Sequence, residues 1–392
     1  MNTVDREAAY FFHTYKRIPL EIERGEGVYL FAKGGTRYLD MFSGLAVNAL
    51  GYNHPKVVQA IQEQSRKYIH LSNYFLQEPQ IRLAELLVKH TGFSKVFFCN
   101  SGTEATEAAI KVVRKWGKPL GKNEIVSFTH AFHGRTMGAL SIMDREKYRD
   151  GYEPFLDNCF VVEYNEVAAL ERIVNEKTAA VFIECIQGEG GISSISPEFA
   201  RAISSLQEKH GFLLVADEIQ SGLGRTGTVF GFEHFGLKPD LVTIAKPLGG
   251  GLPLGAILGG PKVANVLSPG VHGTTFGGNP VACAAGIVVL EEIFERGIIQ
   301  NAVERGKELH EAFHSLKTEF PSLITEVRGY GLMAGLNLSR DGEEIVTVMR
   351  DTHHILINCT AGTVLRFLPP LIITTDHITQ TINALRETFH AL

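Results

Sequence analysis

The sequence predicts an α/β fold in which helices wrap a mostly parallel sheet, followed by a smaller α+β domain. Two observations support this prediction. From residue 95 onward, short apolar runs alternate with stretches of helical periodicity, as in a parallel sheet covered by helices. After residue 280 the pattern changes to two helices, then to short strands and amphipathic helices.

The apolar runs and periodic stretches place the elements in order. The predicted strands are 96–99, 125–128, 160–162, 180–183, 212–216 and 241–245, and the predicted helices are 55–69, 78–90, 103–116, 166–176 and 197–210. Residues 28–31 and 37–40 flank two glycines and predict a hairpin. We expect an N-terminal segment that belongs to the small domain (1–50), a large domain (51–280) and a C-terminal small domain (281–392).

Composition narrows the class of protein. The chain has 392 residues and a net charge of −5, so no basic surplus points to nucleic acid or to an anionic membrane. No run approaches the roughly 20 apolar residues that span a bilayer. The five cysteines lack CxxC spacing, which is typical of a reduced cytoplasmic protein. The first residues resemble neither a signal peptide nor a transit peptide.

Lys246 ends an apolar, β-branched run and precedes three glycines. A lysine at the tip of a buried strand is costly to keep as a bare ammonium ion, because burial favours the neutral amine. A neutral lysine amine is a nucleophile toward carbonyl groups. The alternative interpretation is a lysine that ends the strand and reaches solvent.

Asp217 ends the preceding apolar run, 212–216. Functional groups in a doubly wound sheet stand at the carboxyl ends of strands, so Asp217 and Lys246 are expected at one edge. A carboxylate held there can keep a ring nitrogen protonated through a charge-assisted hydrogen bond.

Residues 100–105 (NSGTEA) follow a predicted strand and open a predicted helix. Unpaired N–H groups, the helix dipole and the hydroxyls of Ser101 and Thr103 suit a phosphate there, and Gly102 lets it approach the backbone. An ordinary N-cap, with Glu104 complementing the dipole, explains the same residues.

The loop at 130–135 (HAFHGR) also follows a strand. Phe132 suits stacking on a flat heterocycle, and Arg135 suits a carboxylate. His130 and His133 alone make a metal site unlikely, since a third ligand is missing. A plain surface loop is the alternative.

Three further features are less specific. Glu184 ends an apolar strand, and Arg366 lies inside another, where a buried arginine demands an anion. Glu184 and a substrate carboxylate are both candidates for that anion. The glycine-rich turn with Thr274 and Thr275 either contacts a phosphate or carboxylate or only connects two lobes.

Residues 222–227 (GLGRTG) match the dinucleotide fingerprint GxGxxG. We reject that interpretation, because no helix pattern follows and no acid stands at the end of a second strand about 20 residues on. A nicotinamide-dependent dehydrogenase therefore stays a remote alternative.

Together these groups supply a lysine nucleophile, a carboxylate for a ring nitrogen, a phosphate cradle and a stacking ring. That set is what pyridoxal phosphate requires. The segments NSGTEA, AFHGR, IECIQGEGG, ADEIQSGLGRTG, IAKPLGGG, HGTTFGGNP and LRFLPP resemble the class III, ornithine-aminotransferase-like family of fold-type I pyridoxal-phosphate enzymes. The resemblance covers nearly the whole chain, and its early segments are most similar to the acetylornithine aminotransferase subfamily.

The resemblance implies a role for each cofactor-binding residue. Lys246 binds the cofactor covalently and moves the proton between substrate and cofactor. Asp217 pairs with the ring nitrogen, Gln220 lies near the ring hydroxyl, and Phe132 packs on the ring. The implied phosphate ligands are Ser101, Gly102, Thr103 and, from the second subunit of a homodimer, Thr275.

The resemblance also implies the substrate contacts. Arg135 binds the α-carboxylate, and Thr274 lies beside it. Glu184 masks Arg366 while a basic substrate is bound and releases it for a dicarboxylate.

The expected reaction moves the terminal amine of N2-acetylornithine to 2-oxoglutarate, giving N-acetylglutamate 5-semialdehyde and glutamate, a step of arginine biosynthesis. Ornithine, N-succinylornithine, 4-aminobutyrate or another ω-amine are alternative substrates. An aminomutase would use the same cofactor residues, and a non-catalytic binding protein with this fold would have no need of Lys246.

Overall fold

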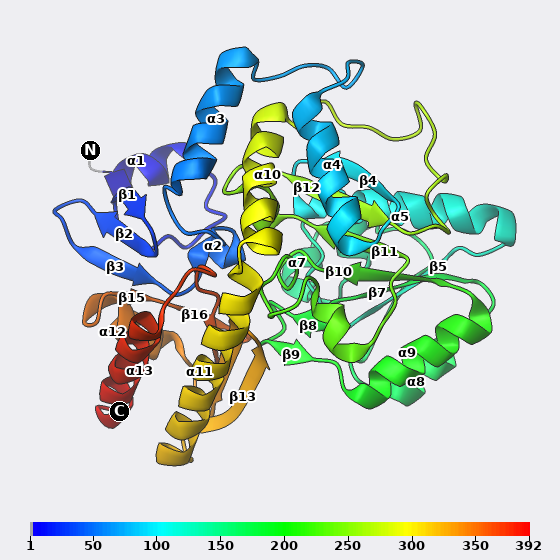
Figure 1. Cartoon of the computed structure of the whole chain (residues 1–392). Coiled ribbons are helices and arrows are strands. Elements are labelled where there is room, and N and C mark those ends of the chain that lie inside the picture. Colours follow the sequence, from blue (N-terminus) through cyan, green and yellow to red (C-terminus); the bar gives the residue numbers. More distant parts are fainter. Residues whose placement is uncertain (1–2) are drawn as a thin grey trace.

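The computed structural model describes residues 3–392, and a seven-stranded sheet lies at the centre of that part of the chain (Figure 1). The strands, in spatial order, are β4 (Lys95–Cys99), β12 (Gly255–Gly259), β11 (Leu241–Ile244), β10 (Leu213–Asp217), β7 (Thr178–Ile183), β5 (Glu124–Phe128) and β6 (Cys159–Val162). Only β12 runs antiparallel to its neighbours. The predicted, mostly parallel sheet is confirmed.

The inner strands are apolar throughout because helices cover both faces of the sheet. Every residue of β7 and β10 is buried. All six predicted strands are present, but β12 was not predicted. Its first residue, Gly255, has to be glycine, because a Cβ there would lie 2.5 Å from the backbone oxygen of Ser101. Because the close backbone approach requires glycine, β12 begins with a residue that does not mark a strand in the sequence.

Six helices pack around this sheet in the described part of the chain: α3 (Pro55–Lys67), α4 (Glu78–Thr91), α5 (Gly102–Gly117), α8 (Val167–Ile173), α9 (Pro197–His210) and α10 (Pro280–Glu295). Side chains cap three of them, since Ser101 accepts from the Glu104 amide at 3.3 Å, Ser196 from the Phe199 amide at 3.0 Å and Asn279 from the Val281 amide at 2.9 Å. The five predicted helices are present. However, α8 is shorter than expected because the Asn175 side chain forms a turn with the Lys177 amide.

A second apolar core combines the two ends of the chain. Its first sheet contains β1 (Ile22–Glu26), β2 (Tyr29–Ala32), β3 (Arg37–Asp40) and β15 (Ile355–Leu356), and its second contains β13 (Ile324–Tyr330), β14 (Met333–Leu338), β17 (Val364–Phe367) and β16 (Asn358–Thr360). The helices are α11 (Ile298–Glu319), α12 (Glu343–Asp351) and α13 (Thr375–His390). The hairpin β2–β3 is as predicted, and its pairing with β15 places the blue and orange-red segments together in Figure 1.

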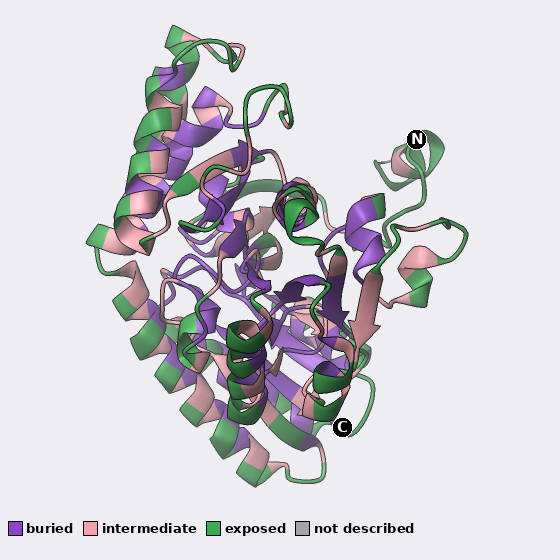
Figure 2. Cartoon of the chain, turned by 90° about the vertical axis from the view of Figure 1, so that its right-hand side faces the viewer, coloured by how far each residue is buried: buried purple, intermediate pink, exposed green. Residues whose placement is uncertain are grey.

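Short elements complete the described chain: α1 (Thr3–Tyr10), α2 (Ser43–Ala46), α6 (Met137–Ser141), α7 (Glu146–Arg149), β8 (Ile186–Gln187), β9 (Ser193–Ser194) and the 3₁₀ helices η1 (Lys118–Leu120), η2 (Gly231–Phe235) and η3 (Lys246–Gly249). Figure 2 shows the buried residues in the interior and exposed residues along the outer helices. Within residues 3–392, no helix combines the length and the apolar character needed to cross a membrane.

The GLGRTG segment lies in a series of turns that lead into η2, not into an α-helix. Its arginine, Arg225, is 1% exposed and donates to the backbone oxygens of Leu332 and Pro369. These carbonyls precede β14 and follow β17, so the loop ties the two cores together. The motif therefore has a packing role here. It is followed by η2 and not by an α-helix, which agrees with the rejection of a dinucleotide site.

Candidate active site

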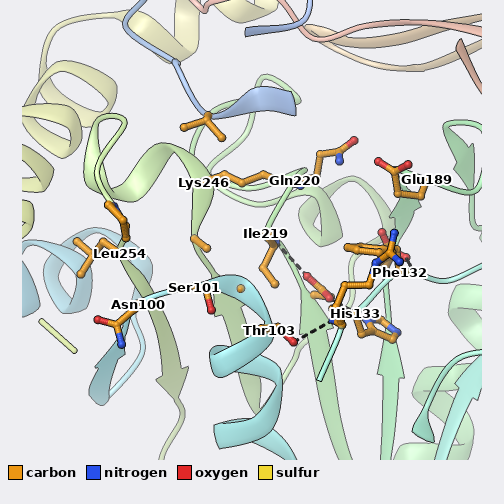
Figure 3. A pocket seen from close by; sticks show the side chains of 18 of the residues that line it. Asn100, Ser101, Thr103, Phe132, His133, Glu189, Ile219, Gln220, Lys246 and Leu254 are labelled. Atoms are coloured by element: carbon orange, nitrogen blue, oxygen red, sulfur yellow. Dashed lines mark hydrogen bonds and ion pairs between the residues drawn. The ribbon is translucent and has the colours of Figure 1, made fainter. Parts of the chain in front are cut away.

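A cavity of about 420 Å³ lies at the carboxyl ends of β10 and β11, beside the N-terminus of α5. It falls within the size range of small-molecule sites. Figure 3 shows Lys246, Gln220 and Glu189 around one side of this space, with Thr103 of α5 and His133 nearby. The lining includes Val47, Ser101, Gly102, Thr103, Phe132, His133, Arg135, Glu184, Glu189, Asp217, Gln220, Lys246 and Leu254.

Lys246 begins η3, and Ala245 alone separates it from the end of β11. Its φ of 41° lies in the left-handed region, which is uncommon for a residue with a Cβ and turns the chain sharply at the cavity wall. Burial lowers the pKa of its amine, and the nearby Arg366 guanidinium lowers it further, against the raising effect of Glu189. A larger fraction of the amine is therefore neutral and nucleophilic than in a solvent-exposed lysine.

Asp217 ends β10 and is 5% exposed. Its Oδ1 accepts from the Ile219 amide at 3.1 Å, and its Oδ2 lies 2.7 Å from Nδ1 of His133. Burial alone would lower the pKa of His133, but the hydrogen bond and charge of Asp217 outweigh it, so the pKa is raised. The hydrogen bond to the carboxylate thus favours the protonated imidazole. His133 had been considered only as half of a metal pair.

The N-terminus of α5 faces the cavity with Ser101, Gly102 and Thr103. Thr103 Oγ1 accepts from the Arg135 amide at 3.2 Å and the Thr136 amide at 3.3 Å, which fixes the loop that follows β5 against the helix. The first N–H groups of a helix have no partner within it and favour an anion. The structure therefore brings the predicted donors and hydroxyls together at the cavity wall, where Ser101 also caps the helix.

Arg366 is 1% exposed on β17, but its ion-pair partner is not the expected one. Its Nη1 lies 2.6 Å from Oε1 of Glu189 and also donates to the backbone oxygen of Gly188 at 2.8 Å. The expectation that Glu184 pairs with Arg366 is wrong in this structure. Glu189 occupies the turn between β8 and β9, where Thr360 holds its backbone oxygen at 2.9 Å, and this turn brings its carboxylate to the arginine.

Glu184 has a different set of partners. Its carboxylate accepts from the Phe132 amide at 2.8 Å and from the Gly188 amide at 3.2 Å. Burial raises its pKa to about 7, against the lowering effect of the neighbouring His133. Because both oxygens hold backbone N–H groups, Glu184 fixes the loop that carries Phe132.

Arg135 is exposed at the edge of the cavity, and two aromatic rings support it. Its guanidinium carbon lies 3.6 Å from the ring centroid of Tyr148 and 5.5 Å from that of Phe132. The two rings meet edge to face, with centroids 6.0 Å apart. Sequence analysis placed Arg135 and Phe132 here but assigned nothing to Tyr148.

Two of the expected residues do not line this cavity. Thr274 Oγ1 accepts from the Asn100 side chain at 3.0 Å, close to the cavity wall but outside its lining. Thr275 is exposed, and within residues 3–392 it does not contribute to the cavity of its own chain. The role of Thr275 in the site of a second copy stays a prediction.

The donor set fits pyridoxal phosphate on chemical grounds. It offers a partly neutral lysine amine, a carboxylate for a ring nitrogen, an aromatic face and a helix N-terminus for a phosphate. Fold and site thus define a pyridoxal-phosphate enzyme of fold type I. The sequence model of class-III aminotransferases matches residues 10–389, and the chain belongs to this family. It is a pyridoxal-phosphate-dependent aminotransferase.

Relatives and solved structures agree with this family. The acetylornithine aminotransferase of Methanocaldococcus jannaschii is 44% identical over 391 residues, which cover 99% of this chain and 98% of the relative. That of Aquifex aeolicus is 44% identical over 96% of this chain and 99% of its own. The N-acetylornithine aminotransferase structure from Stenotrophomonas maltophilia superposes with a TM-score of 0.84 at 36% identity, covering 99% of this chain and 98% of that one.

A solved ornithine aminotransferase from Toxoplasma gondii gives a TM-score of 0.94 at 29% identity, covering 99% of this chain and 94% of that one. The nicotinamide-dependent dehydrogenase alternative is therefore wrong.

Proposed function

We propose that this enzyme moves the terminal amine of N2-acetylornithine to 2-oxoglutarate, giving N-acetylglutamate 5-semialdehyde and glutamate in arginine biosynthesis. The observation that carries the proposal is the ion pair of the buried Arg366 with Glu189, 2.6 Å apart, because Glu189 lines the cavity together with Lys246 and Arg135. Two arginines suit the two carboxylates of 2-oxoglutarate. Relatives named for acetylornithine, 41–44% identical, support the choice of amine.

Several lining residues would hold the cofactor. Asp217 would bind the ring nitrogen, Phe132 would cover the ring, and Gln220 would lie near the ring hydroxyl. Ser101, Gly102 and Thr103 would bind the phosphate. When bound, pyridoxal phosphate supplies the electron sink that lets an amine carbon lose its proton.

Lys246 and Asp217 then divide the proton handling. Burial lowers the pKa of the Lys246 amine, so it can take a proton from the substrate carbon and return one to the cofactor carbon. Asp217 holds a proton at the ring nitrogen, and its pairing with His133 at 2.7 Å keeps that carboxylate in place.

The two substrates make opposite demands on Arg366. Acetylornithine brings an uncharged acyl end and one carboxylate, which Arg135 binds with Thr274 beside it. While this substrate is bound, Glu189 neutralises Arg366. When 2-oxoglutarate enters, the carboxylate next to its oxo group displaces Glu189 and takes the guanidinium. Arg135 then binds the distal carboxylate, which is as remote from the reacting carbon as the carboxylate of acetylornithine.

We also propose a homodimer in which Thr275 completes the phosphate site of the second copy. An exposed apolar group supports this interface, and its members are Ile69, Tyr74, Phe75, Leu76 and Phe276. The Asn73 side chain ties the two loops that carry them, since it donates to the Thr274 and Gly277 backbone oxygens at 3.1 and 3.2 Å. Large contiguous apolar surface favours association.

The two apolar cores support a large domain and a small domain that residues 1–50 join, as expected for 51–280 and 281–392. Because α10 (Pro280–Glu295) packs in the first core, we place the boundary after α10 and not at residue 280. The free thiols of the five cysteines support a cytoplasmic location.

An amine panel tests the substrate assignment. Purified enzyme is mixed with N2-acetylornithine, ornithine, N-succinylornithine or 4-aminobutyrate, and stopped-flow absorbance follows the conversion of the bound cofactor. N2-acetylornithine should give the highest second-order rate constant, and added 2-oxoglutarate should restore the starting spectrum with formation of glutamate. A higher constant for another amine moves the assignment to it. Turnover without any need for an oxo acid would indicate an aminomutase.

A further inference from the structure

We propose that Tyr148 is a positioning residue that holds Arg135 ready for the substrate α-carboxylate and so contributes to the choice of carboxylate-bearing amines. This inference rests on the proposed function, in which Arg135 binds that carboxylate. The Arg135 guanidinium carbon lies 3.6 Å from the centroid of the Tyr148 ring. Tyr148 itself does not line the cavity.

Arg135 needs such a support. Among residues 3–392 its side chain has no ion-pair partner, and it is exposed. A free arginine side chain spreads over many rotamers, and ordering it on binding costs free energy. The negative face of an aromatic ring attracts the guanidinium and restricts it without neutralising its charge. The ring therefore prepares the arginine for an anion, whereas a carboxylate would compete with one.

Tyr148 is held by the segment around it. It lies in α7, its amide donates to the Arg145 backbone oxygen at 2.9 Å, and the Arg145 side chain donates to the His130 backbone oxygen at 2.8 Å. These contacts tie α7 to the loop that starts at the end of β5 and carries Arg135. The same contacts between α7 and this loop therefore position both the Tyr148 ring and Arg135.

The ring also connects two functions of the site. It meets the Phe132 ring edge to face at an interplanar angle of 85°, and Phe132 is the expected cover of the cofactor ring. The Arg145 guanidinium lies 5.8 Å from the Tyr148 centroid, so two cations share one ring. This pair adds positive potential beside the cavity, which favours a substrate that carries a carboxylate.

The test compares two substrates that differ only in the α-carboxylate. N2-acetylornithine has it, and N-acetylputrescine has the same chain and acyl group without it. For Tyr148→Leu we expect KM for N2-acetylornithine to rise about three- to thirtyfold, the range that corresponds to a cation–π contact, with kcat within about twofold. The kcat/KM for N-acetylputrescine should stay unchanged. Tyr148→Phe keeps the ring and should restore the wild-type KM.

Tyr152→Leu is the matched control, because Tyr152 is 58% exposed in the same segment. It should leave both substrates unaffected. A binding measurement adds a readout that needs no turnover. Calorimetric titration of the holoenzyme with N-acetylnorvaline, which has the α-carboxylate but no terminal amine, should show the same loss of affinity in Tyr148→Leu and none in Tyr148→Phe.

Equal losses for N2-acetylornithine and N-acetylputrescine would overturn the proposal, because they would indicate general damage to the site. A Tyr148→Phe variant as weak as Tyr148→Leu would also overturn it. If wild-type enzyme does not convert N2-acetylornithine, the proposed function fails. The Tyr148 proposal is then decided by the titration alone, where unchanged affinity in Tyr148→Leu refutes it.

Discussion

Nδ1 of His133 lies 2.7 Å from Oδ2 of Asp217, and the two side chains are only 1% and 5% exposed. Both residues line the cavity that also contains Lys246, at the carboxyl end of β10. Among the described residues, the other ring nitrogen of His133 has no partner. The carboxylate is therefore the hydrogen-bond partner that orients the imidazole, and the Phe182 ring packs against it edge to face at 6.3 Å.

The pairing predicts a pH-dependent contribution to stability. The pKa of His133 is raised above 6.5, so the contribution is fully present below about pH 6.5 and is lost as pH rises through the raised pKa. His133→Asn keeps a donor near Asp217 but no charge. At pH 6 we expect this variant, freed of cofactor, to lose about 2 kcal/mol in urea unfolding relative to wild type. A loss that does not shrink at alkaline pH would show that the imidazolium charge contributes nothing.

Lys246→Ala should abolish transamination, with kcat reduced at least about a thousandfold, because no other amine described at the cavity wall can replace its nucleophile and proton carrier. The cofactor should also be released on denaturation instead of staying attached, which mass spectrometry after borohydride reduction detects. Lys262→Ala is the control, since Lys262 is 55% exposed and pairs with Asp240 at 3.0 Å away from the cavity. Covalent cofactor in the Lys246 variant would contradict the assignment.

Glu189→Gln should reduce discrimination between amine donors. Without the carboxylate 2.6 Å away, Arg366 keeps its full charge and attracts substrate carboxylates at all times. We expect the ratio of kcat/KM for N2-acetylornithine over glutamate to fall about tenfold. Glu326→Gln removes a comparable pair with Arg328, 2.5 Å apart at the surface, and should leave the ratio unchanged. The same ratio in wild type and Glu189→Gln would disprove the role of this pair.

Gly255→Ala should weaken cofactor binding. The new Cβ would lie 2.5 Å from the backbone oxygen of Ser101, so the start of α5 must shift, and overpacking of this kind costs about 1–3 kcal/mol. A dissociation constant for pyridoxal phosphate at least about tenfold higher is expected from fluorescence titration. In Gly259→Ala, on the same strand, the nearest atom is Val263 Cγ2 at 3.1 Å, a flexible side chain. The affinity of Gly259→Ala for pyridoxal phosphate should therefore stay near that of wild type. Equal losses of affinity in both variants would contradict a specific role for the contact between Gly255 and Ser101.

The parts of the site that the sequence predicted are those set by local pattern. Asp217 ends the apolar strand β10, Lys246 comes two residues after the last residue of β11, and Ser101 is the N-cap of α5. Because parallel strands bring their carboxyl ends to the same edge of a sheet, local patterns are enough to predict that these residues lie close together. Apolar runs also predict six strands of the central sheet but not β12, where Gly255 is required by its close approach to the Ser101 backbone.

Contacts between distant segments were not predictable in this way. The sequence suggests Glu184 or a substrate carboxylate as the partner of Arg366, whereas its pairing with Glu189 depends on the turn between β8 and β9. His133 reaches Asp217 only through the fold of the loop after β5. Side-chain partners chosen by tertiary geometry leave no periodic signal in the sequence.

The pairing of β3 with β15 has a consequence for the synthesis of the chain. Leu39 and Asp40 find their neighbours Ile355 and Leu356 only when nearly all of the protein has left the ribosome. Until then, Val28, Leu39 and Met41 remain without the second core that buries them. The nascent chain thus carries an unshielded apolar N-terminal hairpin through most of translation, which makes this segment a natural point of contact for chaperones.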